Sequence, residues 1–148
     1  MSFIPNIATQ TKQFRPSSML FGSEEALRPI LSYDPTCPLI RLRLANVIEA
    51  NNAAKNEDQR SSSIPIQAAF LRHYDLDRMP DDADEWALAA KWLLELPDAQ
   101  VGLAPHATVA RDEALKAANH ALTLDPHHAE AQQHKAAALA AISENHKD

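Results

Sequence analysis

The sequence predicts an all-α protein built from repeated pairs of antiparallel helices. Pro35, Pro80 and Pro126 stand 45 and 46 residues apart, and a similar helical pattern follows each of them. Ten residues after each proline comes an alanine, and three residues later comes a large aliphatic side chain: Ala45 and Ile48, Ala90 and Leu93, Ala136 and Leu139. A fixed period of this size is typical of helical repeat arrays, and such arrays mostly bind other proteins.

The composition favours helices in one domain. Of 148 residues, 45% are apolar and only two are glycine, and no window shows much of the β-branched alternation of a strand. A chain of this length can bury a sizeable core. We therefore expect a helical domain over residues 23–148 and an extended arm over residues 1–22, where Pro5, Pro16 and Gly22 oppose a helix.

The helices are expected in order from their start and stop signals. Ser23 caps a short helix that ends near Ser32, and Pro38 opens a second helix that ends before the polar loop 56–63. The remaining helices are expected over residues 66–77, 80–96, 107–124 and 126–144, with a second long loop over residues 98–105.

The charge distribution narrows the classes of partner. The net charge is −6; residues 1–22 carry +2 and residues 23–148 carry −8. An acidic domain argues against binding to nucleic acid or to an anionic membrane. No apolar stretch approaches the length of a membrane span, and the N-terminus lacks the order of a secretory signal, so we expect a cytoplasmic protein.

Residues 80–142 resemble the tetratricopeptide repeat family. The first helix of that motif has an aromatic, a small and a large residue at set spacings, which Trp86, Ala90 and Leu93 match. The second helix of the motif and its closing proline are matched by Ala114, Ala118, Ala121 and Pro126. The resemblance is weaker over residues 23–77, where Arg41 takes the place of the aromatic residue, and the period here exceeds the family's period of about 34 residues.

The resemblance implies a short tetratricopeptide-like α-solenoid with long loops inside each repeat and a polar last helix as its cap. In that family the first helices line a concave groove that binds a peptide or a partner helix. Carried over by position, and joined by Trp92, the groove residues here are Arg43, Asn46, Glu49, Lys91, Trp92, Glu95 and Gln133.

The function expected from this groove is that of a non-enzymatic adaptor or chaperone-like module that binds another protein or peptide. No catalytic residue, metal or cofactor is expected. Trp86 is expected in the core, whereas Trp92, six residues later, is expected at its edge, either capping the core or exposed to a partner. The single cysteine, Cys37, is expected to be a small, at least half-buried thiol.

Two other functions remain open. His127, Glu130 and His134 fall on one helical face at spacings that can bind zinc, which would suit a small metal-dependent enzyme. Alternatively, the acidic domain would suit an immunity-type protein that neutralises a basic partner.

The arm over residues 1–22 is expected either to be a loose tail or to dock in the groove. Docking would use Phe3, Ile4, Phe14 and Phe21, and the arm would then occlude the groove or join two copies of the chain. Its length allows either arrangement, because 22 extended residues reach roughly 70 Å at about 3.3 Å per residue.

Overall fold

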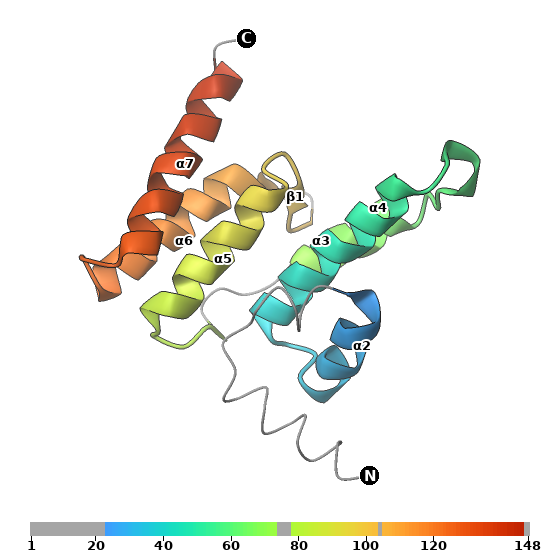
Figure 1. The fold of residues 1–148 in the computed structure, drawn as a ribbon, viewed down its shortest axis with the longest axis horizontal. Helices are drawn as coiled ribbons and strands as arrows, with labels where there is room; N and C mark the ends of the chain where they lie inside the picture. The colour runs from blue at the N-terminus through green and yellow to red at the C-terminus, as the bar shows by residue number, and fades with distance from the viewer. Residues whose placement is uncertain (1–22, 74–77, 104, 147–148) are drawn as a thin grey trace.

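The computed structural model describes residues 23–73, 78–103 and 105–146 (Figure 1). These residues are mostly helical, and the expected arm lies outside them. The elements are α2 (Glu24–Tyr33), α3 (Pro38–Ala54), a 3-10 turn (Glu57–Gln59), α4 (Ile64–Arg72), α5 (Ala83–Glu95), β1 (Gln100–Val101), β2 (Thr108–Val109), α6 (Ala110–Leu124) and α7 (Ala129–His146).

The helices form two lobes that meet at α3. The first lobe, residues 23–73, consists of α2 and α4 packed against α3. The second lobe, residues 78–146, consists of α5, α6 and α7 packed on one another, and its helix α5 also contacts α3. Figure 1 shows the blue-to-green first lobe and the yellow-to-red second lobe splaying apart from this junction.

Each lobe has its own apolar core, and α3 contributes to both. Leu44 and Ile48 of α3 pack in the first core with Leu27 of α2, whereas Leu39 and Leu42 belong to the second core. A helix covered on two sides needs apolar residues around most of its surface, which explains why α3 lacks the one-sided stripe of a surface helix.

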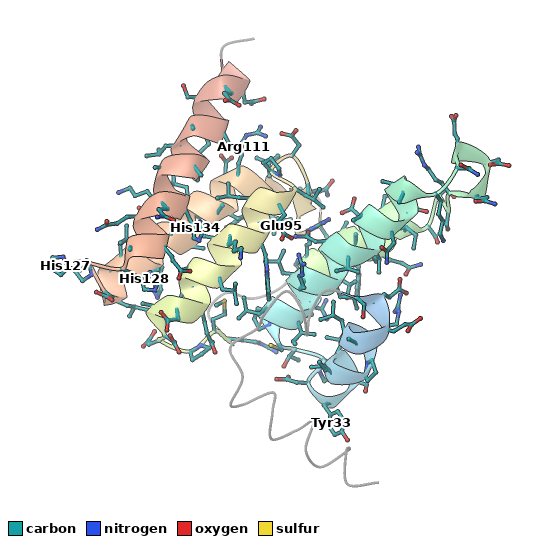
Figure 2. All side chains as sticks on the ribbon, viewed as in Figure 1. Tyr33, Glu95, Arg111, His127, His128 and His134 are labelled. Atoms are coloured by element: carbon teal, nitrogen blue, oxygen red, sulfur yellow. The ribbon has the colours of Figure 1, made fainter. Side chains whose placement is uncertain are left out.

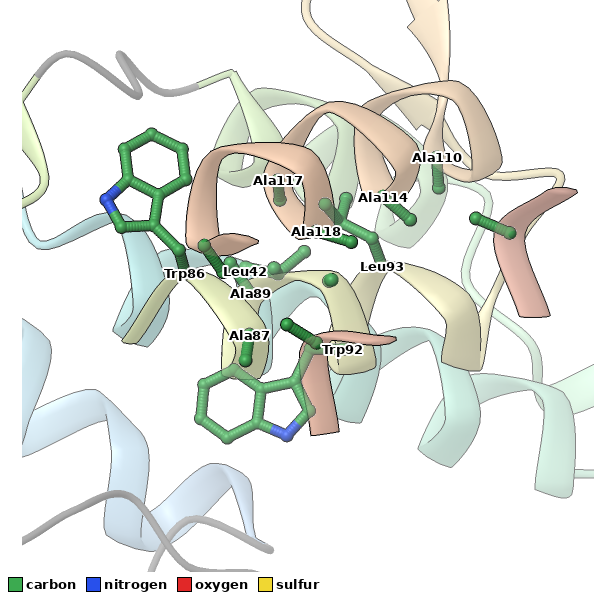
Figure 3. Packing of buried hydrophobic residues seen from close by; sticks show 14 of the residues in the cluster. Leu42, Trp86, Ala87, Ala89, Trp92, Leu93, Ala110, Ala114, Ala117 and Ala118 are labelled. Carbon is green, nitrogen blue, oxygen red and sulfur yellow. The ribbon is translucent and has the colours of Figure 1, made fainter. Parts of the chain in front are cut away.

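The second core is built largely from alanines and two tryptophans. Alanines of α6 are buried against α5, as Figure 3 shows for Ala114 and Ala118 beside Leu93. Small side chains let the two helices approach closely. Trp86 and Trp92 project to different sides of α5 and are only 6% and 4% exposed, so the alternative in which Trp92 is exposed to a partner is wrong.

Helix α4 differs from its prediction at both ends. It begins at Ile64, with Pro65 in the first turn where a missing N–H is harmless, and it ends at Arg72. The last predicted residues of this helix, 74–77, lie outside the described residues. Phe70 of this helix is 59% exposed, and its buried residues are Ala68 and Arg72.

Three helices begin three residues after the repeated prolines. Helix α3 begins at Pro38, α5 at Ala83 and α7 at Ala129. The last two therefore start later than predicted, because the preceding residues form caps: Asp82 accepts the Asp84 N–H at 2.9 Å, and His128 Nδ1 accepts the Ala131 N–H at 3.1 Å.

One hydrogen bond recurs at the spacing of these prolines. In each case the side chain six residues after the proline donates to the proline carbonyl oxygen. The donors are Arg41 to Pro35 (3.0 Å), Trp86 to Pro80 (3.0 Å) and Gln132 to Pro126 (3.1 Å). Three chemically different side chains thus make the same contact between a helix and the turn that precedes it.

A small hairpin joins α5 to α6 and was not expected. Gln100 pairs with Val109 and Val101 with Thr108 in an antiparallel sheet, so the helix predicted from residue 107 begins only at Ala110. Gly102 turns the chain with a positive φ of 92°, which favours glycine. Strands of two residues are too short to give a periodic sequence signal.

Candidate functional site

A surface cleft opens where the two lobes meet. It lies between α3, from Arg43 onward, and the C-terminal end of α5, and has a volume of about 320 Å³. We call it the interlobe cleft; its lining residues are Arg43, Asn46, Val47, Ala50, Asn51, Glu95 and Leu96. A smaller hollow of about 190 Å³ shares Leu96 with it and is also lined by Glu49, Pro97, Asp98 and Ala99.

Asn46 joins three helices beneath this cleft. Its side chain is 4% exposed, and its amide nitrogen donates to the Trp92 carbonyl oxygen at 2.7 Å and to the Glu95 carboxylate at 3.0 Å. Its amide oxygen accepts a hydrogen bond from Arg72 of α4 at 2.7 Å. The Trp92 carbonyl lies in the last turn of α5, where carbonyls have no partner within the helix, so Asn46 also helps to end α5.

Arg43 forms one wall of the cleft. Its guanidinium forms an ion pair with Glu95 and lies 5.5 Å from the centre of the Trp92 ring. Stacking of a cation on an indole is favourable at this distance. Arg43 therefore covers the edge of the second core while presenting a charge to the cleft.

The burial of the cation Arg72 was not predicted from the sequence. It is 2% exposed, it pairs with Glu49, and it donates to Asn46. A buried charge is tolerated only when it is paired and hydrogen-bonded. In the sequence, Arg72 is an ordinary cation on a predicted helix, and nothing local distinguishes it from an exposed one.

Most of the expected groove residues come together, although not all of them. Arg43, Asn46 and Glu95 line the interlobe cleft, Glu49 lines the adjoining hollow, and Trp92 lies buried beneath Arg43. Lys91 and Gln133 are exposed and outside the cleft lining. Four further lining residues were not among the predicted ones: Val47, Ala50 and Asn51 lie on α3, and Leu96 follows the last residue of α5.

The residues of the alternative zinc site do not form a site. His127 and Glu130 are exposed. Figure 2 shows His127 in the turn before the N-terminal end of α7, away from His134. The adjacent His128 is engaged elsewhere, since its Nε2 lies 2.7 Å from Asp84 of α5. In the part of the chain that the structure describes, no group of three His, Cys, Asp or Glu side chains is placed to hold a metal ion.

Burial shifts the pKa of two groups that are often used in catalysis. Burial raises the pKa of the Cys37 thiol, and the nearby carboxylates of Asp34 and Glu85 raise it further, so the reactive thiolate is disfavoured. Burial lowers the pKa of His134, whose Nε2 is enclosed between helices without a hydrogen-bond partner among the described residues.

The chain matches no known family model, no curated protein and no solved structure. Among the described helices, none has both the length and the apolar character needed to cross a bilayer. The fold and the interlobe cleft are therefore the basis for assigning a function.

Proposed function

We propose that this protein is a non-enzymatic binding module, an adaptor or chaperone-like protein of the cytoplasm. Its helices would form a short tetratricopeptide-like solenoid, and the interlobe cleft would hold an extended peptide or a partner helix. The recurring hydrogen bond to Pro35, Pro80 and Pro126 supports the solenoid, because it repeats one local geometry at the spacing of the sequence repeat.

The chemistry of the cleft lining is the main support for this proposal. Arg43 can donate hydrogen bonds, Glu95 can accept them, and the amide of Asn51 can do both. Val47 and Leu96 add apolar wall beside these groups. A peptide offers backbone donors and acceptors together with apolar side chains, so a mixed lining of this kind suits a peptide better than a single charged ligand.

The cleft is also preorganised. Asn46 and its partners hold α3, α4 and α5 together beneath the lining, so little of the site needs to become ordered when a partner binds. Preorganised sites lose less conformational entropy on binding.

The proposal is tested by filling the cleft. Ala50 is an exposed residue of α3 that lines the cleft, and Ala53, one turn later on the same helix, is exposed but outside the lining. Proteins captured from a cell extract by the natural chain should be lost with Ala50→Trp and retained with Ala53→Trp. Capture of the same proteins by both variants would place binding elsewhere.

A second candidate function is favoured by the uneven charge of the molecule. Residues 23–73 contain six acidic and six basic residues, whereas residues 78–146 contain eleven acidic and five basic ones, a formal charge of −6. A protein that neutralises a basic partner would bind through the second lobe. Its affinity would fall steeply with salt, whereas binding in the charge-balanced cleft would change little.

A further inference from the structure

Helices α3, α5 and α7 each follow one of the repeated prolines. Helix α7 leaves exposed the positions that α3 and α5 bury. Ala45 and Ile48 of α3 are 0% and 1% exposed, and Ala90 and Leu93 of α5 are likewise 0% and 1% exposed. The corresponding residues of α7, 46 positions after those of α5, are Ala136, which is exposed, and Leu139, which is 47% exposed.

In the first two cases another helix covers these positions. Ala45 and Ile48 share a core with Ala68 of α4, and α3 and α4 pack along each other. Leu93 of α5 lies against the alanines of α6, as Figure 3 shows. The covering helix follows its partner in the chain in both cases, after a long loop.

The face that α7 does bury is the one directed at the preceding helices. Its buried residues are Ala131 and Ala138, which belong to the second core. Ala138 stands 46 residues after Trp92, the side chain of α5 that lies beneath Arg43 of α3. Helix α7 therefore packs on both helices of the pair before it, α5 and α6, and no helix among the described residues covers its opposite face.

The polar residues predicted for a terminal cap are exposed toward the two ends of α7, at Gln132, Gln133 and Glu144, whereas the stretch between them is apolar. Residues 136–142 are seven consecutive apolar residues, and Ala136, Ala137, Leu139 and Ala140 among them are exposed. A solvated terminal helix ordinarily carries polar residues on its outer face.

We propose that α7 binds an α-helix of another protein, in the position that α4 and α6 hold against α3 and α5. That helix would be antiparallel to α7 and would present small and aliphatic side chains to Ala136 and Leu139. Its flanks would be basic, because it joins the lobe whose formal charge is −6. The same charge argues against a second copy of this chain as the occupant, since pairing would bring two acidic lobes together.

The test uses the full chain and a labelled synthetic helical peptide of about 18 residues as the probe, a length close to that of α7. The peptide carries an alanine and leucine stripe flanked by lysines, and a second peptide has glutamates in place of the lysines. Fluorescence anisotropy should show the lysine peptide binding at least about tenfold more tightly than the glutamate peptide at low salt. The variant Leu139→Glu should weaken binding of the lysine peptide by at least about tenfold.

A matched control is Ile66→Glu on α4, because Ile66 is also an exposed aliphatic residue, at 73%. It should leave binding of the peptide unchanged, and circular dichroism should show both variants to be folded.

Equal effects of the two substitutions, or no binding of the lysine peptide, would overturn the proposal. So would a natural chain that sediments as a dimer and becomes a monomer with Leu139→Glu, since a second copy would then cover the face. Ala50→Trp, which fills the interlobe cleft, should not affect this peptide, so failure of this proposal is distinguishable from failure of the proposed cleft function.

Discussion

The two lobes use different side chains for the same structural tasks. In the second lobe, Trp86 packs in an alanine-rich core and donates its indole N–H to Pro80. In the first lobe, Arg41 occupies the corresponding position, donates to Pro35, and also donates to the carbonyls of Phe70 and Leu71 at the end of α4. The first core is aliphatic, with leucines and isoleucines where the second has alanines.

This difference shows that the geometry of the repeat is kept more closely than its chemistry. An N–H group must reach the proline carbonyl, and an indole, a guanidinium or an amide can each supply it. The packing beneath can use large residues at wider spacing or alanines at close approach.

The largest effect is expected in the aliphatic core of the first lobe. Leu44 is 0% exposed, so Leu44→Ala should leave a cavity and lower the free energy of unfolding by about 2–5 kcal/mol. Urea unfolding followed by circular dichroism measures this change. Leu139→Ala serves as the control: because Leu139 is 47% exposed, this substitution should lower the free energy of unfolding far less. Equal losses would mean that the first core is not packed as described.

The alanine core of the second lobe should instead be sensitive to enlargement. Ala90 is 0% exposed between closely packed helices, so Ala90→Leu should overpack the core and destabilise the protein by about 1–3 kcal/mol. Ala136→Leu, at the corresponding exposed position of α7, should be nearly neutral in the same urea unfolding experiment. A similar destabilisation by both substitutions would contradict the open face of α7.

The recurring hydrogen bond should contribute more to stability where it is buried than where it is exposed. Trp86→Phe removes the donor to Pro80 at a site that is 6% exposed, and we expect a loss of about 0.5–1.5 kcal/mol from the hydrogen bond, plus a smaller packing loss. Gln132→Met removes the donor to Pro126 at an exposed site, where water replaces it. The midpoint temperature of thermal unfolding should therefore fall more for Trp86→Phe than for Gln132→Met. Equal midpoints would show that the buried hydrogen bond makes no net contribution to stability.

The smallest effect is a pH dependence in the second lobe. Burial lowers the pKa of His134; Lys91 and His128 lower it further, while Glu130 opposes them. As the pH falls through the ordinary histidine value of about 6.5, the unfolded chain takes up a proton before the folded chain does, so stability decreases.

The variant His134→Gln should lose less stability over that range than the natural chain. Urea midpoints measured on both sides of about pH 6.5 provide the comparison. The other histidines titrate in both chains, so the difference between them isolates His134. Identical pH profiles would show that His134 does not contribute.

The sequence predicted the helical elements from local signals, because Ser23, Pro38 and the proline period set the helix starts to within a few residues. Arg43, Asn46 and Glu95 were predicted to share a groove only through the resemblance to the tetratricopeptide family, since spacing along one helix cannot bring residues of α3 and α5 together. Arg72 could not be predicted as a buried residue, because its burial depends on Asn46 and Glu49 of another helix. The exposure of Phe70 and Leu139 likewise depends on which helices are present to cover them, which no local pattern records.

The position of α3 has a consequence for how the molecule unfolds. Its residues belong to both cores, so loss of either lobe would expose apolar residues of a helix on which the other lobe depends. Neither core can therefore melt without weakening the other. Despite its two separate cores, the described part of the chain should lose its structure in one cooperative transition, with equal calorimetric and van't Hoff enthalpies.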